Sequence, residues 1–161
     1  MSTKRIVYTR PDGKVAVVTP ATEFVARFST EDEALTAVQT KSVPLDATNI
    51  VVIDVASLPL TRRFRGVWRQ SGAGPPVVDM PLARLQRMDE VRTERAPKLT
   101  KSDVDFLRAR EVGNTTLQTV LKDYRQKLRD LPVTEQPNVN AITTPEALAA
   151  WSPTWPADPV L

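Results

Sequence analysis

The most constraining feature of this sequence is a stripe of apolar residues between Thr115 and Asp130. Its members, which recur every three or four positions among polar and charged residues, are Leu117, Val120, Leu121, Tyr124 and Leu128. This spacing places their side chains on one side of an α-helix. Such a helix is stable only when its apolar side packs against something else. We therefore take all of them except Val120 as candidate interface residues, and the alternative, that they are ordinary core, stays open.

A second helical segment precedes this stripe. Its apolar residues also recur at helical spacing, and they are Leu82, Leu85, Met88, Val91, Leu99, Phe106 and Leu107. Because proline lacks an N–H and crowds the preceding turn, we expect a kink or break at Ala96–Pro97. Gly113 and Asn114 suit the end of one helix and the start of the next, so the chain should turn back there. Residues 79–131 are therefore predicted to form an antiparallel helical hairpin.

The first 78 residues have the pattern of a small sheet domain. The segments Arg5–Thr9 and Val15–Thr19 are rich in β-branched residues and predict two strands. The Pro-Asp-Gly sequence between them favours a tight turn, so the two strands should form a hairpin. Thr30 and Glu33 then have the spacing of a capping box, which predicts a helix from this point to about Ser42.

Three further strands are expected in the same domain, over residues 1–78. The apolar run Ile50–Ile53 is typical of a strand that is covered on both faces. Residues 64–70 alternate between two sets of side chains, and the short strand Val77–Val78 follows a Gly/Pro loop. The predicted fold class is α+β: a small mixed β-sheet with one helix packed on it, followed by the helical hairpin and a tail.

Residues 132–161 are predicted to form an extended tail. Six of the fourteen prolines lie in it, and only Thr144–Ala150 has the pattern of a short helix. Trp151 and Trp155 lie among these prolines, in a segment too interrupted to form a core of its own. Since two exposed tryptophans would be unfavourable, we expect the tail to dock on another surface with both rings as anchors.

The composition excludes several kinds of site. The sequence has no Cys and no His, so a disulfide framework, a Cys/His zinc site and a Ser-His-Asp triad are impossible. The loop Gly72-Ala73-Gly74 is interpreted as a hairpin connection rather than a phosphate-binding loop. Glu90 and Glu94 share a helix side with nearby arginines, which indicates surface ion pairs rather than catalytic carboxylates. We predict no enzymatic activity, no cofactor and no metal.

No apolar run is long enough for a membrane helix, and no apolar core follows the basic pair in Met1–Arg5. We therefore expect neither a signal peptide nor a membrane partner, and we expect a protein that is cytoplasmic when it is made.

The net charge of +3 is unevenly distributed. Residues 131–161 contain three acids and no Lys or Arg, so the first 130 residues carry +6. The candidate basic face comprises Arg62, Arg63, Arg65 and Arg69. Phe64 and Trp68 alternate with these arginines and should point to the opposite face of a strand. This favours a solvated strand face over a single-stranded nucleic-acid site, which stays an alternative.

Six blocks of sequence from Phe64 onward resemble a family of small phage and prophage proteins encoded beside tail-fibre genes. The blocks are Phe64–Trp68, Val78–Arg84, Ala96–Leu99, Asp103–Ala109, Gln126–Pro132 and Thr144–Leu148. They occur in consistent order. The last two are also similar to the ends of phage tail-fibre assembly chaperones. Those chaperones commonly carry an Asp-Trp pair where this chain has Asn114-Thr115-Thr116, so we adopt the broader relationship.

The resemblance implies a non-enzymatic bacteriophage tail structural protein, a tail-fibre-associated or adaptor component that acts by protein–protein docking. It implies other tail proteins as partners, in the fibre, baseplate or neck, and several symmetric copies of this chain. It also implies synthesis in the host cytoplasm and a final place in the virion tail. Two alternatives remain: a tail-fibre assembly chaperone that is absent from the mature virion, and a nucleic-acid-binding protein that uses the basic face.

Overall fold

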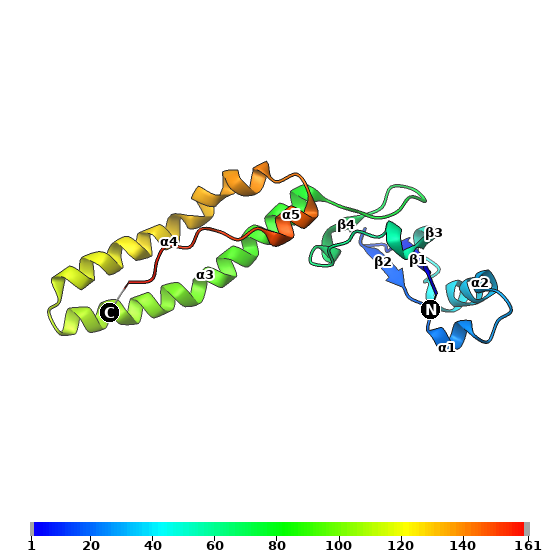
Figure 1. Cartoon of the computed structure of the whole chain (residues 1–161), viewed down its shortest axis with the longest axis horizontal. Coiled ribbons are helices and arrows are strands. Elements are labelled where there is room, and N and C mark those ends of the chain that lie inside the picture. Colours follow the sequence, from blue (N-terminus) through cyan, green and yellow to red (C-terminus); the bar gives the residue numbers. More distant parts are fainter. Residues whose placement is uncertain (1, 160–161) are drawn as a thin grey trace. The chain divides into compact units, whose positions relative to one another are not determined.

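The computed structural model describes residues 2–159, and these have the predicted α+β fold (Figure 1). The chain divides into two units, Met1–Met80 and Pro81–Leu161. The strands of the described residues all belong to the first unit, and the second unit is helical apart from its last residues.

Three antiparallel strands form the centre of the first unit. They are β1 (Lys4–Thr9), β2 (Val15–Val18) and β3 (Thr48–Asp54), in the order β2-β1-β3. The predicted hairpin is confirmed: Gly13 has a φ of +76°, and its N–H donates to the Arg10 carbonyl over 2.8 Å. The expectation of a mixed sheet is wrong, because both neighbours run antiparallel to the central β1.

The predicted capping box opens the helix α2 (Glu31–Ser42). The Thr30 hydroxyl accepts the Glu33 N–H over 3.2 Å, and the Glu33 carboxylate accepts the Thr30 N–H over 3.3 Å. These two bonds satisfy backbone donors that the first turn of a helix leaves without partners. Here a local sequence pattern was sufficient to place a helix correctly.

α2 covers one face of the sheet, where Leu35 and Val38 pack against Ile6 of β1. A short helix, α1 (Thr22–Val25), precedes it, so the prediction of a single helix in this unit was incomplete. α1 is one turn long, and Phe24 joins the same apolar cluster as α2. A helix this short has no hydrophobic periodicity that a sequence pattern could detect.

The opposite face of the sheet packs against a layer that contains β4 (Trp68–Arg69) and β5 (Val77–Val78). The buried cluster between them consists of Val7, Val15, Leu58 and Trp68. The predicted strand over residues 64–70 is wrong, because a 3₁₀ turn occupies Arg65–Val67 and only two residues pair with β5. The pairing is short because two prolines precede β5, and proline cannot donate to a strand ladder.

β3 is an edge strand and is covered on one face only. Val51 and Ile53 pack against the cluster around Trp68, whereas Ile50 is 37% exposed and Val52 is 39% exposed. The expectation that the run Ile50–Ile53 is covered on both faces is therefore wrong. The physical reason is that α2 packs over Ile6 of the central strand and leaves part of β3 in solvent.

Two long antiparallel helices form the second unit, as predicted. They are α3 (Met80–Glu111) and α4 (Thr115–Ala141), and a short helix, α5 (Pro145–Ala150), follows. At the turn between the long helices Gly113 has a φ of +66°, and the Asn114 side chain accepts the Leu117 N–H over 3.0 Å. The predicted glycine stop and asparagine cap are both confirmed.

The structure shows neither a helix break at Ala96–Pro97 nor an extended tail from residue 132. α3 continues through Pro97 without a break, and α4 continues through Pro132 and Pro137, so the extended tail does not begin at residue 132. Pro97 removes the helical donor for the Thr93 carbonyl, and both residues are exposed, so water can take the place of that donor. At Pro132 the donor comes from the neighbouring helix, through Arg95.

Candidate functional site

The predicted apolar stripe is mostly core. Leu121, Tyr124 and Leu128 are buried, whereas Leu117 at the start of α4 is only partly buried. The first three therefore present no surface to a partner in this conformation. Leu117 lines a depression of about 290 Å³ at the tip of the hairpin, together with Ala109 and Val112.

Residues 151–159, which we call the strap, contain no helix or strand and run between α3 and α4 (Figure 1). From the start of the strap to its end, the contacted residues advance along α3 and go back along α4. The strap therefore runs parallel to α3, antiparallel to α4 and towards the hairpin tip. Its contact residues on the two helices are Arg87, Lys98, Tyr124 and Glu135. Trp151 and Trp155, which we expected to anchor on another surface, thus lie against the chain's own hairpin.

The first anchor of the strap is Trp151, which lies against the buried Arg87. The guanidinium carbon of Arg87 is 5.3 Å from the centre of the indole ring, and Arg87 donates to the Trp151 carbonyl over 3.3 Å. Glu90 and Glu94, predicted to make ion pairs, accept from the same guanidinium over 3.3 and 3.0 Å. A buried arginine requires such partners, and the carbonyl and the ring of Trp151 are two of them.

The second anchor is Glu135, a buried carboxylate of α4. It accepts the Thr154 N–H of the strap over 2.9 Å and the Asn138 side-chain amide over 2.7 Å. A buried carboxylate is unfavourable unless donors surround it. The strap backbone supplies one of these donors, so Glu135 and the strap stabilise each other.

The third anchor joins the far end of the strap to both helices. The Lys98 ammonium lies 5.4 Å from the centre of the Trp155 ring, and the Tyr124 hydroxyl donates to Asp158 over 2.5 Å. Burial, followed by the hydrogen bond to Asp158, raises the pKa of Tyr124 to about 12. The same hydrogen bond, followed by the Lys98 charge, lowers the pKa of Asp158 below its ordinary value.

Sequence reasoning identified the two tryptophans but not Arg87, Lys98, Glu135 or Asp158. One signal was available: residues 131–161 carry only negative charges, and the residues before them carry a positive excess. This asymmetry is consistent with a tail that pairs with its own chain.

The candidate basic face lies in the first unit. Arg62, Arg63 and Arg65 are exposed and Arg69 is half-buried. Phe64 and Trp68 are fully buried, so neither ring is available to stack on a base. The loop Gly72-Ala73-Gly74 connects β4 to β5, as predicted, and its Gly74 carbonyl accepts from the Gln70 amide over 3.0 Å.

Two negative findings apply to residues 2–159. None of their helices combines the length and the apolar composition that crossing a membrane requires. Within the same range no three Asp or Glu side chains are grouped so that they could hold a metal ion.

No protein-family model, curated protein sequence or solved structure significantly matches this chain. A functional proposal therefore rests on the blocks of resembling sequence and on the geometry of the hairpin and strap.

Proposed function

We propose that this chain is a non-enzymatic bacteriophage tail protein, a tail-fibre-associated or adaptor component of the virion that acts by docking. The observation that carries the proposal is where the resembling blocks lie. Gln126–Pro132 supplies the buried Leu128 and Leu131, and Thr144–Leu148 supplies the cap and the buried leucine of α5. Ala96–Leu99 supplies Lys98, which holds the strap. Three of the six blocks thus lie in parts that close the hairpin.

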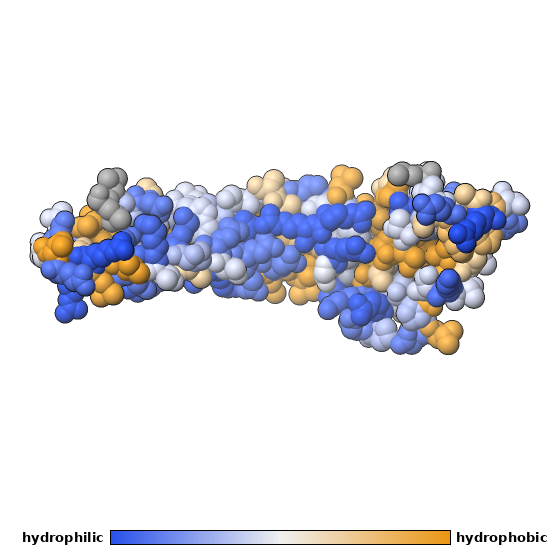
Figure 2. Space-filling view, turned by 90° about the horizontal axis from the view of Figure 1, so that it is seen from below, coloured by the Kyte–Doolittle hydropathy of each residue, from blue (hydrophilic) through white to orange (hydrophobic). Residues whose placement is uncertain are grey.

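The proposed docking surface is the tip of the hairpin. Val112 is 78% exposed there, and it lines the apolar depression with Ala109 and Leu117. Figure 2 shows apolar surface among hydrophilic surface at the end of the view where the hairpin turns. The strap stiffens the hairpin behind this tip. The hairpin therefore loses less conformational entropy when a partner binds. The partner is another tail protein, in the fibre, baseplate or neck.

A matched pair of variants tests this surface. Val112→Asp places a charge at the tip, and Val133→Asp places the same charge on α4 at a residue that is 76% exposed in the described structure. We expect Val112→Asp to abolish incorporation into purified particles, measured by quantitative mass spectrometry, and Val133→Asp to leave it unchanged. Equal incorporation of the two variants would exclude the tip as the docking surface.

The same measurement on the unmodified protein distinguishes the main alternative. A fixed integer ratio to the fibre protein in purified particles supports a structural role in the virion tail. Abundance in the infected-cell lysate with absence from particles supports an assembly chaperone, which the last two blocks also resemble. A nucleic-acid-binding protein would instead bind DNA with an affinity that falls steeply with salt.

A further inference from the structure

β3 forms one of the two edges of the sheet in the first unit. In the order β2-β1-β3, this strand pairs only with β1. The Gln70 amide bonds to the Asn49 carbonyl over 2.8 Å, at the start of the strand. Beyond that point no strand of the described residues pairs with its outer side. The unpaired N–H and C=O groups of an edge form a template for another strand.

The run Ile50–Ile53 contains no charged residue and no proline, which are two of the devices that protect an edge strand. A bulge interrupts the pairing with β1 just before it, where Asn49 has a φ of +52°. After the bulge come four β-branched residues without Lys or Pro. The opposite edge of the sheet, β2, is only four residues long and is at least half-buried throughout. β3 therefore offers the longer and more exposed of the two edges.

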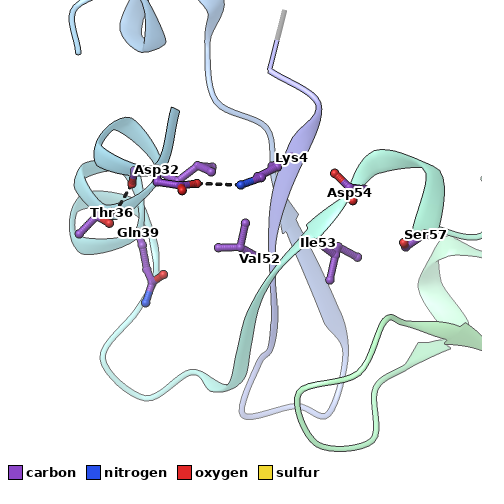
Figure 3. A pocket seen from close by; sticks show the side chains of 9 residues that line it. Lys4, Asp32, Thr36, Gln39, Val52, Ile53, Asp54 and Ser57 are labelled. Carbon is purple, nitrogen blue, oxygen red and sulfur yellow. Dashed lines mark hydrogen bonds and ion pairs between the residues drawn. The ribbon is translucent and has the colours of Figure 1, made fainter. Parts of the chain in front are cut away.

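A depression of about 470 Å³ lies between β3 and α2 (Figure 3). Val52 points into it, beside Leu35, and the ion pair of Lys4 with Asp32 (2.8 Å) lies at its side. Because Val52 and Ile50 lie on this face and are more than a third exposed, a further strand beside β3 would cover both side chains.

The strand is suited to pairing with a copy of itself. Two identical antiparallel strands pair with matching faces only when the two-fold axis passes between the two copies of one residue, because opposed residues have their side chains on the same face of the sheet. Val52 is the middle residue of Ile50–Asp54, so an axis there uses the whole run. The single charge of the run, Asp54, then lies opposite Ile50 of the other copy, and the two aspartates lie at opposite ends of the interface.

We propose that β3 pairs antiparallel with β3 of a second copy of this chain, centred on Val52, to form one continuous sheet from both copies. This inference does not depend on the proposed role in a phage tail. It adds an interface in the first unit, whereas the tail proposal concerns the second. Because the two faces of the joined sheet continue across the axis, the two Val52 side chains meet on the side that carries the α2 helices.

A single thiol tests both the pairing and its register, since the natural chain has no cysteine. Opposed residues in antiparallel strands have Cβ atoms about 4.5–5.5 Å apart, close enough for a disulfide after a small adjustment. We expect Val52→Cys to form a covalent dimer under mild oxidation. The matched control is Ile50→Cys, which has the same face and nearly the same exposure (37% against 39%). Its counterpart in the other copy would lie about 14 Å away, out of reach.

Sedimentation of the unmodified chain provides the second measurement. We expect a reversible dimer, loss of that dimer in Val52→Lys, and no change in Leu45→Lys, whose side chain is fully exposed outside the strand. A monomer at the highest soluble concentration would overturn the proposal and leave the edge to a strand of another protein. Equal cross-linking of Val52→Cys and Ile50→Cys would also overturn it, because collisions and not a defined register would then explain the disulfide.

Discussion

The guanidinium of Arg95 lies 3.2 Å from the Leu128 carbonyl oxygen, at a position where α4 has no donor of its own. In an α-helix the carbonyl of residue 128 accepts from the N–H of residue 132, and here that residue is proline. Arg95 also donates to the Arg129 carbonyl over 3.0 Å. A side chain of α3 thus replaces a hydrogen bond that the backbone of α4 cannot make.

Arg95→Met should destabilise the second unit by about 2 kcal/mol, because it removes a charged donor from the Leu128 carbonyl, which has no helical donor of its own. Methionine keeps most of the apolar stem, so the loss reports the hydrogen bonds. Chemical denaturation followed by far-ultraviolet circular dichroism measures it.

Pro132→Ala is the control for this prediction. It restores the N–H that the Leu128 carbonyl lacks, so Arg95→Met should cost about 1 kcal/mol less in the Pro132→Ala background than in the natural sequence. Additive effects of the two changes would contradict the compensation between Arg95 and Pro132.

Glu135→Gln should loosen the middle of the strap. Glutamine keeps the shape of the side chain but has one acceptor oxygen for the two donors, the Thr154 N–H and the Asn138 amide. We expect the Thr154 amide to exchange with solvent about tenfold faster, as a lost bond of about 1.4 kcal/mol requires. Hydrogen exchange followed by NMR measures this rate. Glu146→Gln, at an exposed position of α5, should leave it unchanged.

The pair of Tyr124 and Asp158 should make stability depend on pH at the alkaline end. The folded pKa of Tyr124 is raised from 10.0 to about 12, so its contribution is complete below pH 10 and is lost as the pH rises towards 12. Tyrosinate absorbance measures the titration, in a Tyr8→Phe background because the chain has two tyrosines.

Asp158→Asn separates the two causes of this shift. The pKa of Tyr124 should fall when the charge is removed but stay above 10.0, because burial is the larger cause. A return to the ordinary value would mean that burial contributes little. Asp158 acts in the opposite direction, at acid pH, because its pKa is lowered in the folded protein. Its contribution to folding stability is present above the ordinary pKa of an aspartate and is lost as the pH falls through the pKa of the folded state.

Thr30→Ala should destabilise the first unit by about 1 kcal/mol, because it removes the side-chain acceptor for the Glu33 N–H. Thermal unfolding measures the loss. Thr30→Ser keeps the hydroxyl and should retain most of the stability. If serine and alanine were equally destabilising, packing of the threonine methyl and not the cap would be responsible.

The elements that could be predicted are those set by neighbouring residues. The turn at Gly13, the capping box at Thr30 and the reversal at Gly113–Asn114 each depend on residues within about four positions of one another. The sequence pattern contains all the information that such features need.

The elements that could not be predicted depend on distant residues. Pro132 is tolerated because Arg95 lies opposite it, 37 positions earlier in the numbering. The strand at Trp68–Arg69 is short because its partner is limited by prolines on the next segment. At the candidate site, the tryptophans were identified from their types, but their partners Arg87 and Lys98 belong to a helix that ends 40 residues before Trp151. Local patterns do not encode such pairs.

The position of the strap also sets an order of events on the ribosome. Tyr124 and Glu135 emerge before Thr154 and Asp158, so the nascent hairpin first forms with these polar groups bonded to water. The first unit comprises Met1–Met80, so all of it is synthesised before the hairpin is finished, and it can fold first. Docking of the strap is then the last step of folding, and translation must reach Asp158 before the second unit acquires its full set of bonds.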